Sequence, residues 1–318
     1  MKKFGTALVC AALAAAACKG ENKDRSSAPT PAGSAAPAAV EAAATPPAPP
    51  APAEAAADAA VAPDAAAAPD ATGPLKVTYR PPKVGDIIET TFQQHTEGVM
   101  LLSNQKDPLV QHREEVRTAE VLAVKGDAVT KLKVTFGKVV SYRKMGFQVL
   151  KDQTPLEGKT FLVTAPGGKI TITDKDGNLV SGDTFRELRS IFVGQVGKPD
   201  PRKPFFTGRT FRKGEGIVLS PEEMKAFALP SDESVKPTRM TVTWVGQEGD
   251  VATFAITSLM TGKQGPMTMT FDVKATLKLE VSTMRPLALE DEAQLRGTGS
   301  MELEAKMTGS EIYAYPSK

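Results

Sequence analysis

Polar and apolar residues alternate along several short segments in the second half of the chain. The alternation is clearest over 267–273, 277–281 and 301–307. A period of two is typical of antiparallel strands that have one buried and one solvated face. The side chains that we expect on the core face, or against an apolar ligand, are Met267, Met269, Phe271, Leu277, Leu279, Met301 and Leu303.

Turn-forming dipeptides separate the alternating segments at the spacing that hairpins need. The clearest are Gly126-Asp127, Gly167-Gly168, Gly177-Asn178 and Gly249-Asp250. Alternation and turns together predict a mainly β domain over 75–318, folded as an antiparallel meander. A domain of this length can bury roughly 70% of the surface that its unfolded chain exposes, so it can be stable without disulfides.

Two short helices are expected between the strands. One is predicted over 184–196, where apolar residues recur at helical spacing after the cap residue Asp183. The other is predicted to begin at Pro221, because Ser220 and Glu223 form the pattern of a capping box. Each helix is expected to lay its apolar side against the sheet.

The domain carries signs of an internal repeat. The shared pattern is a Pro and a Gly upstream of a Gly-Asp turn, offset by 123 positions, at Pro81, Gly85 and Gly126 and again at Pro204, Gly208 and Gly249. We interpret it as a duplication with half-repeats at about 79–197 and 202–318, joined by the polar connector 194–206. Two curved half-sheets are then expected to pack as a sandwich, clam or flattened barrel. Chance matching of common turn residues is the alternative.

Residues 1–17 have the parts of a secretory signal: two lysines, then an apolar stretch too short to cross a bilayer as a stable helix. The stretch ends in Leu-Ala-Ala-Ala-Ala-Cys at Cys18, which resembles the lipobox of bacterial lipoproteins. The resemblance implies that Cys18 becomes the acylated first residue. Ala15 departs from the pattern, since the family usually has Leu there. Ordinary signal cleavage, with Cys18 left free, is the alternative.

Residues 18–74 are predicted to be a lipidated cysteine followed by a tether rich in Ala and Pro. The tether has no aromatic residue, and its prolines interrupt each Ala run, so it is predicted to be disordered. It would reach roughly 170 Å if fully extended at about 3.1 Å per residue, and nearer 40 Å as a flexible coil. Either reach is expected to keep the folded domain clear of the lipid headgroups.

Charge and cysteine content limit the partners. Loss of the signal leaves 37 of the 39 basic residues against 37 acidic ones, so no basic footprint for nucleic acid is expected. Cys18 would be the sole remaining cysteine, and its acyl chains are the predicted link to a membrane. Lys19 lacks the inner-membrane retention signal of the enteric sorting rule, so we expect the outer membrane, at its periplasmic face or the cell surface.

Motifs for catalysis are missing from the sequence. The chain has two histidines, His95 and His112, and neither a nucleophile elbow, a zinc-protease helix nor a phosphate-binding loop. The histidines could bind zinc together with Glu114 or Glu115, although alternating His and Glu are more typical of a solvated strand face. We therefore expect no enzyme, no metal and no cofactor.

The folded region is similar in outline to uncharacterised lipidated β domains, and more distantly to the half-barrels of LolA-type lipoprotein carriers. This resemblance rests on the lipobox, the tether and the meander, and implies no functional residue beyond Cys18. The predicted function is a non-catalytic interaction or structural module of the cell envelope, with an envelope protein as its partner. The alternative is a binder or carrier of an apolar ligand, such as a lipid, between the half-sheets, for which Met-rich faces are suited. A carrier of that kind needs a cavity of roughly 300 Å³ or more.

Overall fold

The computed structural model describes the folded region in seven stretches, which are 73–102, 105–146, 148–151, 156–227, 235–264, 267–299 and 302–316. The signal, Cys18, nearly all of the tether and Met301 lie outside these residues. Antiparallel strands dominate the described part, which confirms the mainly β prediction.

The strands begin with β1 Leu75–Lys76, β2 Ile87–Leu102, β3 Gln105–Lys125, β4 Ala128–Met145, β5 Gln148–Lys151, β6 Thr160–Thr164 and β7 Thr171–Asp174. They continue with β8 Thr210–Phe211, β9 Gly216–Val218, β10 Val235–Glu248, β11 Val251–Gln264, β12 Met267–Glu280, β13 Pro286–Thr298 and β14 Glu302–Ala314. The helices are the 3₁₀ turn η1 Pro166–Gly168, then α2 Gly182–Phe192, α3 Lys203–Thr207 and α4 Pro221–Phe227.

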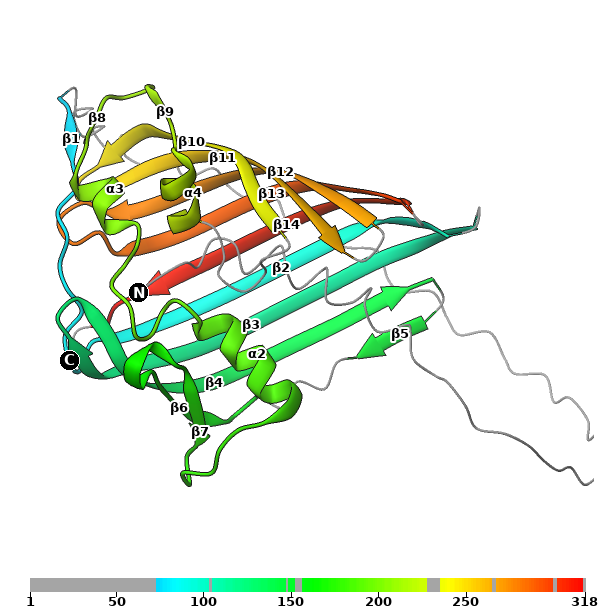
Figure 1. The fold of residues 1–318 in the computed structure, drawn as a ribbon, viewed down its shortest axis with the longest axis horizontal. Coiled ribbons are helices and arrows are strands. Elements are labelled where there is room, and N and C mark those ends of the chain that lie inside the picture. The colour runs from blue at the N-terminus through cyan, green and yellow to red at the C-terminus, as the bar shows by residue number, and fades with distance from the viewer. Residues whose placement is uncertain are drawn as a thin grey trace, which may run out of the picture. The chain divides into compact units, whose positions relative to one another are not determined.

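Twelve strands form one antiparallel sheet (Figure 1). Its order is β7-β6-β4-β3-β2-β14-β13-β12-β11-β10-β9, with β5 paired to the far end of β4. β1 and β8 form a separate two-stranded sheet. Among the described strands β7 and β9 do not pair with each other, so the large sheet is open rather than closed into a barrel.

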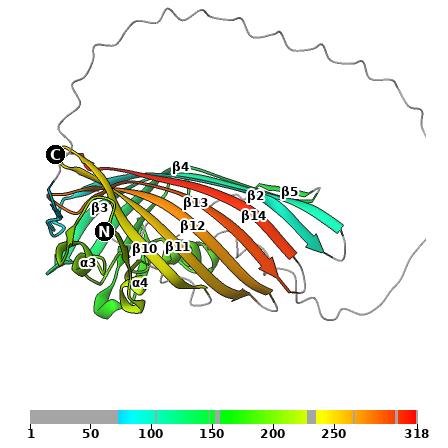
Figure 2. The same ribbon diagram turned by 90° about the horizontal axis from the view of Figure 1, so that it is seen from above.

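The two halves of the chain meet edge to edge, where β2 pairs with β14 from Leu101 and Glu302 to Glu89 and Ala314. They therefore continue one curved sheet (Figure 2). The pairing leaves neither central strand as an exposed edge, and it keeps the apolar rows of both halves on one face. Across the sheet, successive neighbours come earlier in the chain in both halves, as in β6-β4-β3 of one half and β12-β11-β10 of the other. The duplication itself stays a prediction.

The large sheet has one mostly buried face, which we call the inward face, and one mostly exposed face, the outward face. On β12 the burial alternates as predicted, with Met267, Met269 and Phe271 buried and Thr268 and Asp272 exposed. The outward face is polar and carries cross-strand ion pairs between Arg296 and Glu304 and between Lys306 and Glu292. This alternation fixes the register, because a slip of one residue would turn every apolar side chain toward water.

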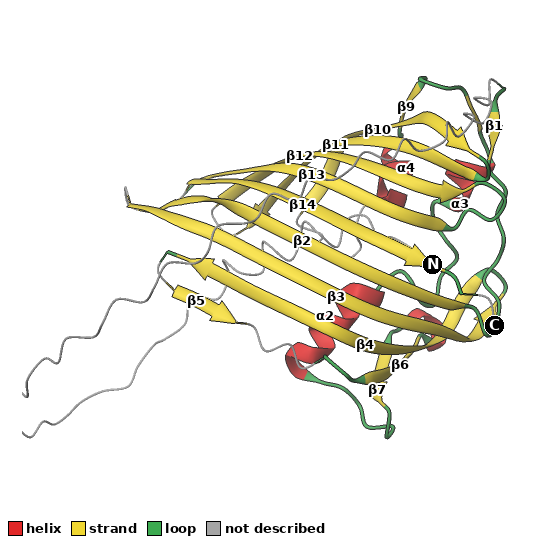
Figure 3. Cartoon of the chain, turned by 180° about the vertical axis from the view of Figure 1, so that it is seen from behind, coloured by secondary structure: helices red, strands yellow, loops and turns green. Residues whose placement is uncertain are grey.

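All three α-helices lie on the inward face (Figures 1 and 3). α2 begins after Ser181 and ends at Phe192, somewhat earlier than predicted. α4 has the predicted capping box: the backbone N of Ser220 donates to Glu223 Oε2 at 2.9 Å, and the backbone N of Glu223 donates to Ser220 Oγ at 3.3 Å. No helix in the described stretches is both long and apolar enough to span a bilayer.

The connector between the halves contains α3, which the sequence did not predict. Pro204 suits the first turn of a helix, and Phe205 and Phe206 are buried by it. Two charged residues of this polar connector are buried. Asp200 and Arg202 are each 6% exposed and form an ion pair of 3.0 Å between Oδ2 and Nη2.

The helices create two helix-covered cores near one end of the sheet. The first lies under α3 and α4, where Phe206 packs against Phe211 and Phe254 with ring centroids 6.0 and 5.2 Å away. The second lies under α2, where Leu188 and Phe192 join a cluster with residues of β3, β4, β6 and β7. Both helices and strands therefore contribute side chains to each of these cores.

The seam between the halves gives a first prediction. A Cβ on Gly98 of β2 would lie 2.4 Å from the carbonyl O of Glu304 and 2.5 Å from Cβ of Ala305, both on β14. Gly98→Ala should therefore lower the free energy of unfolding by about 1–3 kcal/mol in urea denaturation. Gly246→Ala is the control, because nothing lies within 4 Å of its added Cβ. Equal stabilities of the two variants would contradict the close packing of the seam.

Candidate ligand-binding face

A third apolar cluster, which we call the Met-lined patch, occupies the inward face beyond the helix-covered cores. Its buried members are Phe92, Met260, Met267, Met269, Phe271, Val273, Ala293, Leu295, Ala305 and Met307. Val235 and Leu303 are partly buried against it. These residues come from β2 and from β10 to β14, so the patch crosses six neighbouring strands.

The Met-lined patch differs from the two helix-covered cores in the kind of element that contributes its side chains. In the described part of the chain, every member lies on a strand of the same sheet, and no helix or loop contributes a side chain. Side chains on one face of one sheet form a single layer, whereas a core needs a second layer against it. The described elements therefore do not supply the second layer of this patch.

The patch is shaped by a glycine on β13. A Cβ on Gly297 would lie 2.8 Å from Met267 Cε and equally 2.8 Å from Met269 Sδ, so both Met side chains occupy the space above this residue. Met side chains are unbranched and flexible, and they can repack around different apolar shapes. The surface over β12 and β13 is therefore adaptable.

The residues predicted for an apolar site fall into two places. Met267, Met269 and Phe271 lie in the Met-lined patch, and Leu303 packs against it. Leu277 and Leu279 instead lie in the helix-covered core under α3 and α4, and Met301 is outside the described residues. The periodicity identified the inward face, but it could not show which part of that face the helices cover.

A row of buried charges on β3 was missed in the sequence. Arg113, Glu115 and Arg117 are successive inward residues, and Glu115 is 1% exposed. Arg113 Nη2 donates to Glu115 Oε2 at 2.7 Å and to Glu187 Oε1 of α2 at 2.9 Å. Arg117 donates to Glu115, and its Nη2 donates to Glu311 Oε1 of β14 at 3.0 Å. The alternation of opposite charges, Arg-x-Glu-x-Arg, was the available signal.

The electrostatics of this row make Glu115 its ionised centre. Burial by itself raises the pKa of Glu115, but the guanidinium groups of Arg117 and Arg113 more than offset it, so the pKa lies below its ordinary value. Glu311 behaves differently. Burial raises its pKa to about 8, although Arg117 acts in the opposite direction. Glu311 therefore binds a proton far more readily than an exposed carboxylate.

Asp291 of β13 is a second acidic group on the inward face. Its side chain is buried, with 8% exposure, and burial alone raises its pKa from 3.8 to about 7. Within the described stretches no hydrogen bond or ion pair is found at its carboxyl group. It follows Leu289 of a helix-covered core and precedes Ala293 of the Met-lined patch along the inward row of β13. Asp291 therefore marks the boundary between the two regions.

The histidines lie on the outward face. His95 and His112 are cross-strand partners with ring centroids 6.2 Å apart, and His112 lies 5.5 Å from Tyr142. Glu114 also faces outward and pairs with Lys138, whereas Glu115 faces inward. The four residues weighed for zinc therefore do not converge, and the described residues hold no group of three metal-binding side chains.

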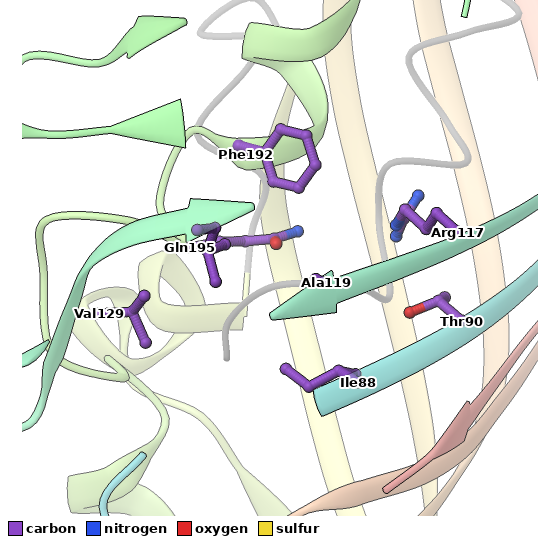
Figure 4. Close-up of a pocket in the computed structure, with 8 residues that line it drawn as sticks. Ile88, Thr90, Arg117, Ala119, Val129, Phe192 and Gln195 are labelled. Carbon is purple, nitrogen blue, oxygen red and sulfur yellow. The ribbon is translucent and has the colours of Figure 1, made fainter. Parts of the chain in front are cut away.

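A small cavity lies beside the charged row (Figure 4). Arg117, Thr90 and Ile88 line it from the sheet, and Phe192 and Gln195 cover it. Its volume of about 20 Å³ suits about one water molecule. This cavity is too small for a lipid.

Comparisons with known proteins leave the family open. No family model matches the chain, and no curated protein matches its sequence. A structure concerned with lipid–protein interactions in lipovitellin matches at 9% identity with a TM-score of 0.39, over 75% of this chain and 25% of that chain. An S-type phycobiliprotein lyase from Guillardia theta matches at 7% identity with a TM-score of 0.18, over 72% of this chain and 88% of that one. Both scores are low, so neither likeness bears on function.

The charged row predicts unequal effects at two neighbouring residues. Glu115→Ala leaves Arg113 and Arg117 buried without their shared partner, and should lower the free energy of unfolding by about 3–5 kcal/mol. Glu114→Ala removes an ion pair with the exposed Lys138 and should cost about 1 kcal/mol or less. Chemical denaturation of both variants measures the difference. Similar losses would contradict the buried network.

Asp291 predicts a dependence of stability on pH. Because its pKa is raised from 3.8 to about 7 in the folded chain, the unfolded chain loses this proton first, and the free energy of unfolding falls as pH rises through that window. Asp291→Asn removes this fall, which amounts to about 1.4 kcal/mol per pH unit. Between about pH 5 and pH 7 the variant should gain on the order of 2–3 kcal/mol relative to wild type.

Denaturant titrations at several pH values measure this gain. Asp272→Asn is the control, because Asp272 is exposed on the outward face of β12, and it should follow the wild-type curve. Parallel curves for wild type and Asp291→Asn would show that Asp291 titrates as an ordinary exposed carboxylate.

Proposed function

We propose that this chain is a membrane-anchored envelope lipoprotein whose β domain binds an apolar ligand, such as a lipid acyl chain, on the Met-lined patch. The observation that carries the proposal is the patch itself. Its ten buried apolar residues share one face of one sheet, and no described helix or loop packs on them. The proposal includes no catalytic step.

The free energy of apolar burial supports a bound partner. Covering one Met, Leu or Phe side chain is worth roughly 1.5–3 kcal/mol relative to leaving it in water. The patch includes Met260, Met267, Met269, Phe271, Leu295 and Met307, none of which is more than 4% exposed, so a ligand here would keep out of water side chains that the fold already buries.

The anchor and the location rest on the N-terminal sequence. The lipobox at Cys18 supports acylation, and Lys19 supports placement at the outer membrane. The Ala/Pro tether supports a domain that works at some distance from its own membrane. A domain so placed would meet lipids or envelope proteins in the periplasm or at the cell surface.

An apolar segment of an envelope protein is the second candidate for the same patch. The six strands that contribute to it offer a surface wide enough for a helix or an extended peptide. A lipid is favoured because the Met side chains over Gly297 form an adaptable surface.

Native mass spectrometry without detergent tests the proposal, using the polypeptide from Lys19 onward, without the acylated cysteine, after incubation with a phospholipid. The wild type should retain lipid. Met269→Gln places an amide in the patch, costs roughly 1–3 kcal/mol of binding and should weaken lipid retention about tenfold.

The matched control is Met240→Gln, the same change at a buried Met of the same face but under the helices. It should lower stability while lipid binding is kept. Circular dichroism establishes that each variant is folded. A wild type that stays free of lipid would contradict the proposal, and crosslinking in envelope fractions would then test the protein partner. Equal binding by the two variants would place the ligand elsewhere.

A further inference from the structure

We propose that the ligand of the Met-lined patch is an amphiphile with a cationic group, and that this group pairs with Asp291 at the boundary of the patch. The inference rests on the proposed function and adds the chemical class of the ligand. It is carried by the position, the burial and the surroundings of one carboxyl group.

Asp291 is built into the inward face at the point where the patch begins. Along β13 the inward residues are Leu289, Asp291, Ala293 and Leu295, each of which is buried. Leu289 belongs to the core under α3 and α4, whereas Ala293 and Leu295 belong to the patch. A ligand that lies on the patch and reaches the edge of this core therefore meets the carboxyl group.

The residues beside Asp291 are short. Its cross-strand partners are Ala275 on β12 and Gly309 on β14, and the next inward residue on its own strand is Ala293. Long side chains at these positions would fill the space over the carboxyl group. None of these neighbours has a side chain long enough to reach over the carboxyl group of Asp291, which is 8% exposed.

The charges that face Asp291 leave its own charge unbalanced. The nearest inward titratable groups on the neighbouring strand β14 are Glu311 and Tyr313. On β3, which lies two strands beyond β14, they are Glu115 and Arg117. Arg117 already pairs with both Glu115 and Glu311. A buried carboxylate needs a partner charge or a proton, and a cationic ligand would supply the charge.

Two other inward cations do not balance Asp291. Arg202 pairs with Asp200. Arg143 of β4 is the cross-strand partner of the buried Gln111 and so faces inward, but four strand steps separate β4 from β13. At about 4.8 Å per step the separation is roughly 19 Å. Arg143 would instead favour an anionic amphiphile, which makes charge the property to test.

The patch also fits the length of an alkyl chain. From Asp291 to Gly297, where Met267 and Met269 lie, β13 advances six residues, or roughly 20 Å at about 3.4 Å per residue. A single long chain could lie along Ala293 and Leu295 toward these Met side chains. The cationic group would then sit at the helix-covered end and the chain terminus at the Met end.

The test compares three probes that share one alkyl chain and differ in charge: dodecylammonium and dodecanoate, each below its micelle concentration, and dodecanol below its solubility limit. Isothermal titration calorimetry at about pH 8 uses the polypeptide from Lys19 onward. Wild type should bind dodecylammonium about tenfold more tightly than dodecanol, as expected for one charge-assisted contact. Asp291→Asn should remove this preference and leave dodecanol binding unchanged.

Lowering the pH toward about 5.5 should weaken the preference in wild type, because Asp291, whose pKa is raised by burial to about 7, then binds a proton. Asp272→Asn removes one negative charge from the outward face and should keep the preference. A preference for dodecanoate, or a preference for dodecylammonium that survives in Asp291→Asn, would overturn the inference while the proposed function stands. Failure of all three probes to bind would overturn both.

Discussion

An open antiparallel sheet with one apolar face must have that face covered. The rest of this structure depends on which part of the face the helices cover and which part they leave. The pairing of β2 with β14 makes the sheet continuous, so the apolar rows of both halves extend over one face. The helices α2, α3 and α4 cover the two cores near one end. The Met-lined patch is the part of that face on which no described helix or loop packs. The proposed binding site rests on the limited extent of the helices rather than on a separate motif.

The inward face carries charged groups as well as apolar side chains. Arg113, Glu115 and Arg117 tie β3 to α2 and β14 through a network in which both arginines are satisfied. Buried networks of this kind add little net stability but penalise the loss of any one partner. Asp291 has no hydrogen bond or ion pair with the described residues and borders the patch, so we propose that a ligand neutralises its charge. The apolar area and this carboxyl group together are the basis for proposing a cationic amphiphile as the ligand.

The sequence predicted the strands better than it predicted which part of the inward face the helices cover. Period-two burial on β12 and the turn at Gly249 followed from local pattern, and so did the capping box of α4. The burial of Glu115 did not, since a charged residue on a strand is ordinarily solvated unless a partner lies on another element, here Glu311 as well as the α2 residue Glu187. Leu279 and Met269 have the same phase and the same burial. Only the tertiary position of α3 and α4 separates core from candidate site, and no local signal encodes it.

Methyl NMR of methionine tests the central claim most directly, because the chain carries its own controls. Met260, Met267, Met269 and Met307 lie in the Met-lined patch, whereas Met224, Met240 and Met284 lie in the core under the helices. Addition of a short-chain phospholipid below its micelle concentration should shift the methyl signals of the first group and leave those of the second in place. Shifts confined to the second group, or no shift at any methyl, would contradict a binding site on the patch.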